Sequence, residues 1–130
     1  METELVMLGW SIALGLGGVL LAAGMATHQR GLLWNLSNRD GDAIPLTGAA
    51  ARAQRASANF LETFVFFAAA ALAVVLTHRN TTHTALGAQV YFWARAVYLP
   101  IYCVGIPYLR TAIYAVSLWG LLQLIEVLLQ

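Results

Sequence analysis

Residues 52–77 read RAQRASANFLETFVFFAAAALAVVLT, an apolar run whose charged side chains all lie in its first half. The run is long enough for a helix that crosses the roughly 30 Å hydrocarbon core of a bilayer, which takes about 20 residues. Arg55, Asn59 and Glu62 are spaced by four and then three residues, so they lie on one side of this helix. Charged groups in hydrocarbon are costly and persist where they face a bundle interior, a polar cavity or a ligand. The stretch therefore predicts a membrane helix that carries a polar site.

The whole chain has the composition of a membrane protein, with 130 residues of which 60% are hydrophobic and 10% charged. A soluble domain of this size could not bury so much apolar surface. The seven basic residues are dispersed and the net charge is +1, so no nucleic-acid-binding patch is expected. Cys103, the only cysteine, is expected to be a small buried hydrophobe. His78 and His83 have no carboxylate or thiol partner in their loop, so no metal site is expected.

Four apolar segments predict an all-α, four-transmembrane-helix bundle that forms a single domain over residues 1–130. The segments run over residues 5–26, 55–77, 85–109 and 111–130. Glu2 and Glu4 precede the first segment where a signal peptide would have basic residues, so we expect this segment to remain in the mature protein. Its small residues recur at four-residue intervals, which favours close contact between helices.

The connections between the segments differ in length and chemistry. A long connection over residues 27–51 separates the first two segments, and Thr47 is placed to cap the second helix. Connections of this length are often functional. The short polar connection at 77–84 predicts that the second and third helices are antiparallel neighbours. At 105–107 the sequence Gly-Ile-Pro predicts the end or the bend of a helix.

The orientation in the membrane is predicted from the basic residues near the helix ends. The second connection has one arginine, Arg79. The arginines in or beside the first connection are Arg30, Arg39, Arg52 and Arg55, and Arg110 lies beside the third. The positive-inside rule then places the first and third connections in the cytoplasm and both termini on the other side.

Three of the predicted helices each carry a polar stripe at the helical repeat. On the second, third and fourth helices in turn, the stripes are Arg52, Arg55, Asn59 and Glu62; Tyr91, Arg95, Tyr98 and Tyr102; and Arg110, Tyr114 and Ser117. Burying these stripes against one another would make a polar cavity. Arginine binds carboxylates through bidentate forks, glutamate accepts from an ammonium group, and asparagine hydrogen-bonds a peptide group. A small zwitterionic peptide would satisfy this set.

The stretches 52–64, 91–102 and 105–111 resemble the MAPEG family, the membrane-associated proteins in eicosanoid and glutathione metabolism. They read RAQRASANFLETF, YFWARAVYLPIY and GIPYLRT. Together with the helix lengths, the resemblance covers essentially the whole chain. It implies a four-helix protomer in a homotrimer, with glutathione as co-substrate bound between neighbouring protomers near the cytoplasmic side.

The resemblance also assigns roles to residues. The predicted glutathione-binding set comes from the second and third helices and comprises Arg52, Arg55, Asn59, Glu62, Arg95, Tyr98 and Tyr102. Arg110 is similar to the arginine that activates the glutathione thiol. Thr111 stands where a prostaglandin-forming member has serine, which is a departure from that isomerase. Arg30 is placed to reach the ligand of a neighbouring protomer.

The function that the resemblance implies is a glutathione-dependent transferase or peroxidase for lipophilic electrophiles or hydroperoxides that arrive from the bilayer. Two other classes stay open. One is a non-catalytic MAPEG-fold protein that binds a membrane lipid or glutathione. The other is a small exporter, which would be expected to carry an acidic coupling residue in its first helix, and the predicted helix has none.

Some of these residues also have a structural interpretation. Arg55 and Glu62 could pair to hold helices together, and Arg95, in the middle of its helix, could hydrogen-bond a neighbouring helix. Tyr91 and Ser117 are interpreted as packing residues.

Overall fold

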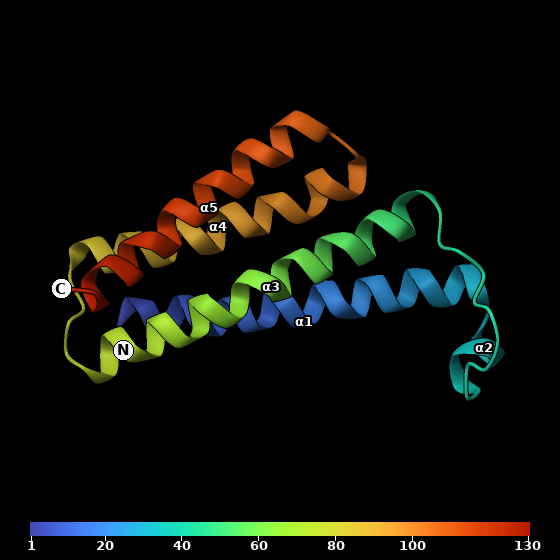
Figure 1. Ribbon diagram of the computed structural model, residues 1–130, viewed down its shortest axis with the longest axis horizontal. Coiled ribbons are helices and arrows are strands. Elements are labelled where there is room, and N and C mark those ends of the chain that lie inside the picture. The colour runs from blue at the N-terminus through green and yellow to red at the C-terminus, as the bar shows by residue number, and fades with distance from the viewer.

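The computed structural model describes residues 1–130, and all its regular elements are helices. These are α1 (Thr3–Arg30), α2 (Leu32–Leu36), α3 (Gly48–Leu76), α4 (Thr82–Val104) and α5 (Pro107–Leu128). Figure 1 shows the four long helices running alternately in opposite directions, with both chain ends at the same end of the bundle. The all-α class predicted from the sequence is confirmed.

The turn between α4 and α5 falls at the predicted glycine and proline, but the predicted limits of the two helices were wrong. Gly105 has a φ of 95° and is the left-handed C-cap of α4, with its N–H donating to the carbonyl of Ile101. Pro107 is the first residue of α5, where the lack of an N–H costs nothing. As a consequence, Arg110 lies in the first turns of α5, the helix on whose polar stripe it was predicted.

The long connection also differs from the prediction. It contains the short helix α2, and α3 begins at Gly48, seven residues before the predicted limit. Thr47 is the N-cap of α3, yet its side chain makes no capping hydrogen bond. Instead, the side chain of Gln29 at the end of α1 holds the Thr47 backbone, accepting from its N–H at 3.1 Å and donating to its carbonyl at 2.9 Å.

The core lies where α3 and α4 face each other, and α1 and α5 cover its sides. The ring of Tyr91 stacks on that of Phe67 with centroids 4.2 Å apart. The Tyr91 hydroxyl shares a 3.0 Å hydrogen bond with Thr63 Oγ1, so the polar end of a fully buried ring has a partner. These contacts confirm that α3 and α4 are neighbours and that Tyr91 is a packing residue.

Helices α4 and α5 approach each other closely at two glycines. A Cβ atom added at Gly87 would lie 2.5 Å from the carbonyl oxygen of Gly120, and one added at Gly120 would lie 2.6 Å from the carbonyl oxygen of Gly87. Backbone therefore lies against backbone at this crossing, as at small-residue contacts between membrane helices. Either glycine can be replaced only if the two helices move apart.

We expect Gly87→Ala to destabilise the protein by about 2 kcal/mol, because overpacking against a rigid backbone is not relieved by a rotamer change. The measurement is the free energy of unfolding in mixed detergent micelles. Gly9→Ala is the matched control, since no atom lies within 4 Å of a Cβ added at Gly9. Equal stability of the two variants would show that α4 and α5 do not cross at these glycines.

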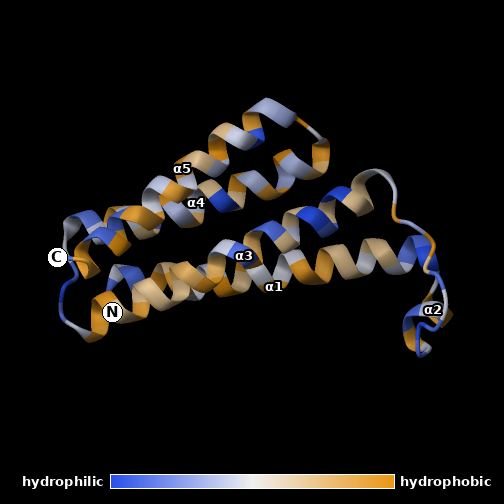
Figure 2. Ribbon diagram, in the orientation of Figure 1, coloured by the Kyte–Doolittle hydropathy of each residue, from blue (hydrophilic) through white to orange (hydrophobic).

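Three helices, α1, α3 and α5, are long and apolar enough to cross a membrane. Large apolar side chains on their outer faces are more than half exposed, among them Leu16, Phe66 and Leu122. Figure 2 shows that the strongly polar residues gather at the ends of the bundle and along the first half of α3. The outer surface of the bundle is thus suited to lipid.

An acidic residue is present in the first helix, contrary to the expectation from the sequence. Because α1 begins at Thr3, Glu4 lies in its first turn, where it is 1% exposed and accepts a 2.5 Å hydrogen bond from Thr84 Oγ1 at the start of α4. The apolar run that marked the helix starts one residue later, which is why this residue was missed. The argument against an exporter, that the first helix has no acidic residue, therefore no longer holds.

Candidate functional site

The predicted site residues gather at one end of the bundle. They come from the first half of α3, the second half of α4 and the first turns of α5. Since consecutive helices run in opposite directions, these three parts lie at the same end, near the turn between α4 and α5 (Figure 1).

Two arginines from different helices contact the ring of Tyr102. Arg55 on α3 donates from Nε to the Tyr102 hydroxyl at 3.1 Å, and its guanidinium carbon is 5.9 Å from the ring centroid. The guanidinium carbon of Arg110 on α5 is 4.7 Å from the same centroid. Tyr102 thus links two cationic groups, and neither donates a hydrogen bond to a carboxylate. This is a positively charged, partly exposed cluster.

A second arginine cluster lies deeper in the same end of the bundle. Arg95 is 1% exposed and donates from Nη2 to Asn59 Oδ1 at 2.6 Å. Its guanidinium carbon is 4.3 Å from the ring centroid of Tyr98, and it also lies over the rings of Tyr114, at 5.4 Å, and Phe60, at 5.6 Å. Aromatic faces attract a cation at these distances. The charge of Arg95 is therefore stabilised by three aromatic rings and one amide.

Tyr98 joins the two clusters. It is buried, its ring meets that of Tyr102 edge-on with centroids 5.6 Å apart, and it lies 6.2 Å from that of Tyr114. The structure accordingly brings six predicted residues into one connected group: Arg55, Asn59, Arg95, Tyr98, Tyr102 and Arg110.

Arg52 lies beside this group and makes a different kind of contact. Its Nε donates to the backbone carbonyl of Cys103 at 2.9 Å, and its side chain lies against Gly105. A cation suits the carbonyl end of a helix, so Arg52 fastens α3 to the end of α4. The side chain of Cys103 is half-buried, less than predicted.

Glu62 lies outside the group. It is exposed on the outer face of α3, two helical turns from the exposed side chain of Arg55. The side-chain hydrogen bond of Arg55 goes to Tyr102, so the structural pairing of Arg55 with Glu62 that the sequence allowed is not present in the protomer.

Two members of the deeper cluster were not in the predicted binding set. Tyr114 was placed on the polar stripe of the fourth helix, four residues after Arg110, but was given no binding role. Phe60 is an apolar residue in an apolar helix and gives no signal. Ser117 is buried and donates to the carbonyl of Tyr114 at 2.6 Å, in agreement with a packing role.

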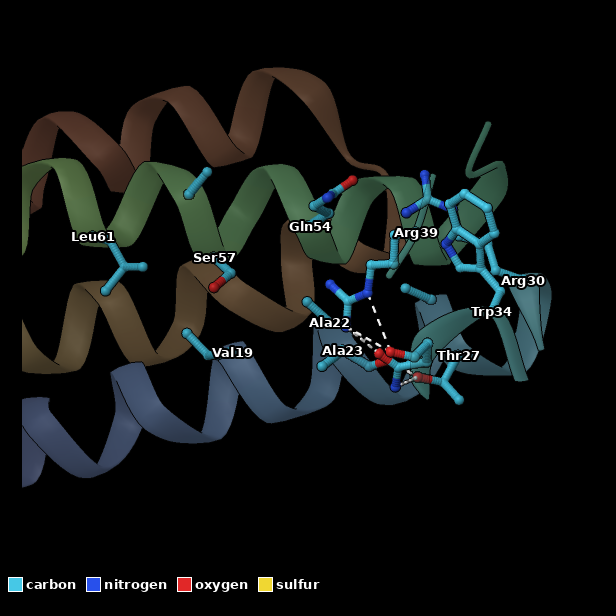
Figure 3. Close-up of a pocket in the computed structure, with 13 residues that line it drawn as sticks. Val19, Ala22, Ala23, Thr27, Arg30, Trp34, Arg39, Gln54, Ser57 and Leu61 are labelled. Carbon is cyan, nitrogen blue, oxygen red and sulfur yellow. Dashed lines mark hydrogen bonds between the residues drawn. The ribbon is translucent and has the colours of Figure 1, made fainter. Parts of the chain in front are cut away.

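A separate cavity of about 370 Å³ lies between α1, α2 and α3 at the same end of the bundle (Figure 3). Its lining combines apolar side chains such as Val19 and Leu61 with Arg30 and Arg39, and it contains no acidic residue. Arg30 donates to the carbonyl of Ile44 at 2.8 Å, and Arg39 to Asn35. The first contact ties the connection to the end of α1, and the second lies within the connection.

The model of the MAPEG family matches residues 7–129 of the chain. No curated protein sequence matches it.

Proposed function

The chain belongs to the MAPEG family, and on that premise we propose that it is a glutathione-dependent membrane transferase or peroxidase for lipophilic electrophiles or hydroperoxides. The observation that carries the proposal is the contact of both Arg55 and Arg110 with one tyrosine, Tyr102. Such a cluster offers one guanidinium for a carboxylate and another for a thiolate within a single small site.

The outer face of α3 suits the ends of glutathione, which has two carboxylates and an ammonium group. Arg55 uses only Nε within the protomer, so both its Nη groups can bind a carboxylate. Glu62 can accept from the ammonium group, and it lies about 10 Å further along the helix by the rise per residue. An extended tripeptide covers a similar length. Asn59, between them in sequence, keeps its NH₂ group for a peptide carbonyl.

Arg110 is the proposed catalytic residue. A free thiol has a pKa of about 8.5 and is mostly protonated at neutral pH. A guanidinium beside the sulfur favours the thiolate and lowers that pKa. Arg110 lies in the first turns of α5, where the helix dipole also favours an anion. The guanidinium stabilises charge and does not itself exchange a proton.

The thiolate can react in two ways. It can form a C–S bond to an electrophilic carbon as the π bond or the bond to the leaving group at that carbon breaks, which gives a thioether. Alternatively, it can attack a hydroperoxide, forming an S–O bond as the O–O bond breaks, and with one proton from water this gives an alcohol and a sulfenic acid. A second glutathione then converts the sulfenic acid to the disulfide and water.

The proposal includes four membrane-spanning helices and a homotrimer. Because α3 and α5 run in the same direction, a chain in which both cross the bilayer needs α4 to cross between them (Figure 1). Exposed Arg55 and Glu62 would be costly against lipid, which favours their cover by glutathione and a neighbouring protomer. Arg30 of that protomer is the proposed further contact. By the positive-inside rule, the basic residues at this end favour the cytoplasmic side for it and the other side for both termini.

Glutathione binding to the detergent-solubilised protein tests the proposal. We expect calorimetry to detect binding and the bound ligand to show the ultraviolet absorbance of a thiolate. S-methylglutathione is the control, since it should bind without that absorbance. Binding without a thiolate would favour a non-catalytic protein that binds glutathione. No binding would reject the proposed function and favour the non-catalytic protein that binds a membrane lipid. Assays with an electrophile and with a hydroperoxide then separate transferase from peroxidase.

A further inference from the structure

Arg95 is the buried cation of the site, and its enclosure is at odds with a direct role in binding. At 1% exposure its guanidinium is closed in by rings of Phe60, Tyr98 and Tyr114. A ligand that arrives between protomers meets the outer face of the bundle and cannot reach this group unless those rings move.

The remaining donors of Arg95, Nε and Nη1, also lie in the interior. Both atoms are buried and have no hydrogen-bond partner within the protein. Arg95 lines a cavity of about 10 Å³ between α1, α3 and α4, whose walls include Gly15, Gly18 and Ser57. A space of that size holds one water molecule and excludes a tripeptide. The free donors are therefore not available to glutathione.

The hydrogen bond from Arg95 to Asn59 connects this interior to the proposed ligand. Asn59 is half-buried, and its Oδ1 accepts from Nη2 of Arg95 at 2.6 Å. Since an amide has one oxygen and one NH₂ group, occupying the oxygen from the inside fixes which group is left for a ligand. A charge-assisted hydrogen bond also holds the side chain in a single rotamer more firmly than a neutral one.

We propose that Arg95 is a positioning residue, which sets the amide of Asn59 from the buried side and does not itself touch glutathione. This rests on the proposed function and departs from the binding role that the resemblance implies for Arg95. Its consequence is that Arg95 acts on affinity only through Asn59.

A double-mutant cycle tests this dependence. We expect Arg95→Gln and Asn59→Ala each to weaken glutathione binding about tenfold, a loss in the range of one hydrogen bond to a charged group. The double variant should bind no more weakly than Asn59→Ala, because Arg95 has nothing left to position. Losses that multiply to about a hundredfold would overturn the proposal.

Two ligand analogues give a second test that does not depend on how much protein folds. Each lacks one of the two carboxylates of glutathione. If Arg95 is a positioning residue, Arg95→Gln weakens glutathione and both analogues by the same factor. If Arg95→Gln does not weaken the binding of one analogue, Arg95 directly contacts the carboxylate that this analogue lacks. That result would overturn the proposal. If Arg95→Gln yields no folded protein, Arg95→Lys is compared with the wild type in the same way.

The controls separate this proposal from the function on which it rests. Arg79→Gln makes the same substitution at the other end of the bundle, where Nη1 of Arg79 donates to the carbonyls of Val127 and Gln130 at 3.2 Å. Its glutathione affinity should equal that of the wild type. Absence of binding to the wild type would reject the proposed function and this inference together, whereas multiplying losses would reject the inference alone.

Discussion

We expect Arg110→Ala to keep glutathione bound but to remove its thiolate signal and to lower turnover by about a hundredfold or more. Loss of one preorganised charge-stabilising group typically costs that much in rate. The carboxylates of glutathione would still be held by Arg55, so affinity should change by less than about fivefold, the scale of a partner at the edge of a site. The thiolate absorbance at saturating glutathione and single-turnover rates with an electrophile measure the two effects separately.

Arg110→Lys is the matched variant for this prediction. It keeps a cation over the Tyr102 ring, so we expect a partial thiolate signal at a higher pH than in the wild type. If alanine lowered affinity and thiolate formation by the same factor, Arg110 would be a binding residue. If alanine changed neither, the activating group would have to be sought elsewhere in the site.

The helical repeat was sufficient to predict much of this site. Arg55 and Asn59 were placed on one face of α3, and Tyr98 and Tyr102 on one face of α4, and in the structure these faces meet. The meeting of these faces could be predicted because polar residues are rare in these helices and are expected at inward positions.

The depth of each residue could not be predicted in the same way. A helical wheel gives the direction of a side chain but not its neighbours, and the enclosure of Arg95 depends on rings from α3 and α5 as well as from α4 itself. Glu62 shares the sequence stripe of Asn59 yet faces outwards, since a polar stripe is wider than the contact between two helices.

The helix limits were missed for a different reason. Apolar content defines the membrane-exposed part of a helix, whereas hydrogen bonds and caps define its ends. Glu4 was therefore left outside α1, and residues 107–109 were placed in the wrong helix. The second error matters for function, because it is the start of α5 that brings Arg110 to the ring of Tyr102.

We expect Arg55→Ala to weaken glutathione binding by about a hundredfold, the loss typical of removing one partner of a desolvated, hydrogen-bonded charge pair. Calorimetry on the solubilised protein measures it. Arg55→Lys should fall between alanine and the wild type, because lysine keeps the charge and loses the bidentate fork. Tyr102→Phe should cost less than alanine at 55, since it removes only the hydroxyl that accepts from Nε of Arg55.

The stability of the same variant distinguishes a ligand contact from a structural one. Arg55 is exposed and its side-chain hydrogen bond in the protomer goes to Tyr102, so Arg55→Ala should change the free energy of unfolding without ligand by about 0.5 kcal/mol or less. Glutathione should then stabilise the wild type against heat and not the variant. The opposite pattern, a large loss of stability with affinity per folded molecule unchanged, would mean that Arg55 holds helices together and that the carboxylate of glutathione is bound elsewhere.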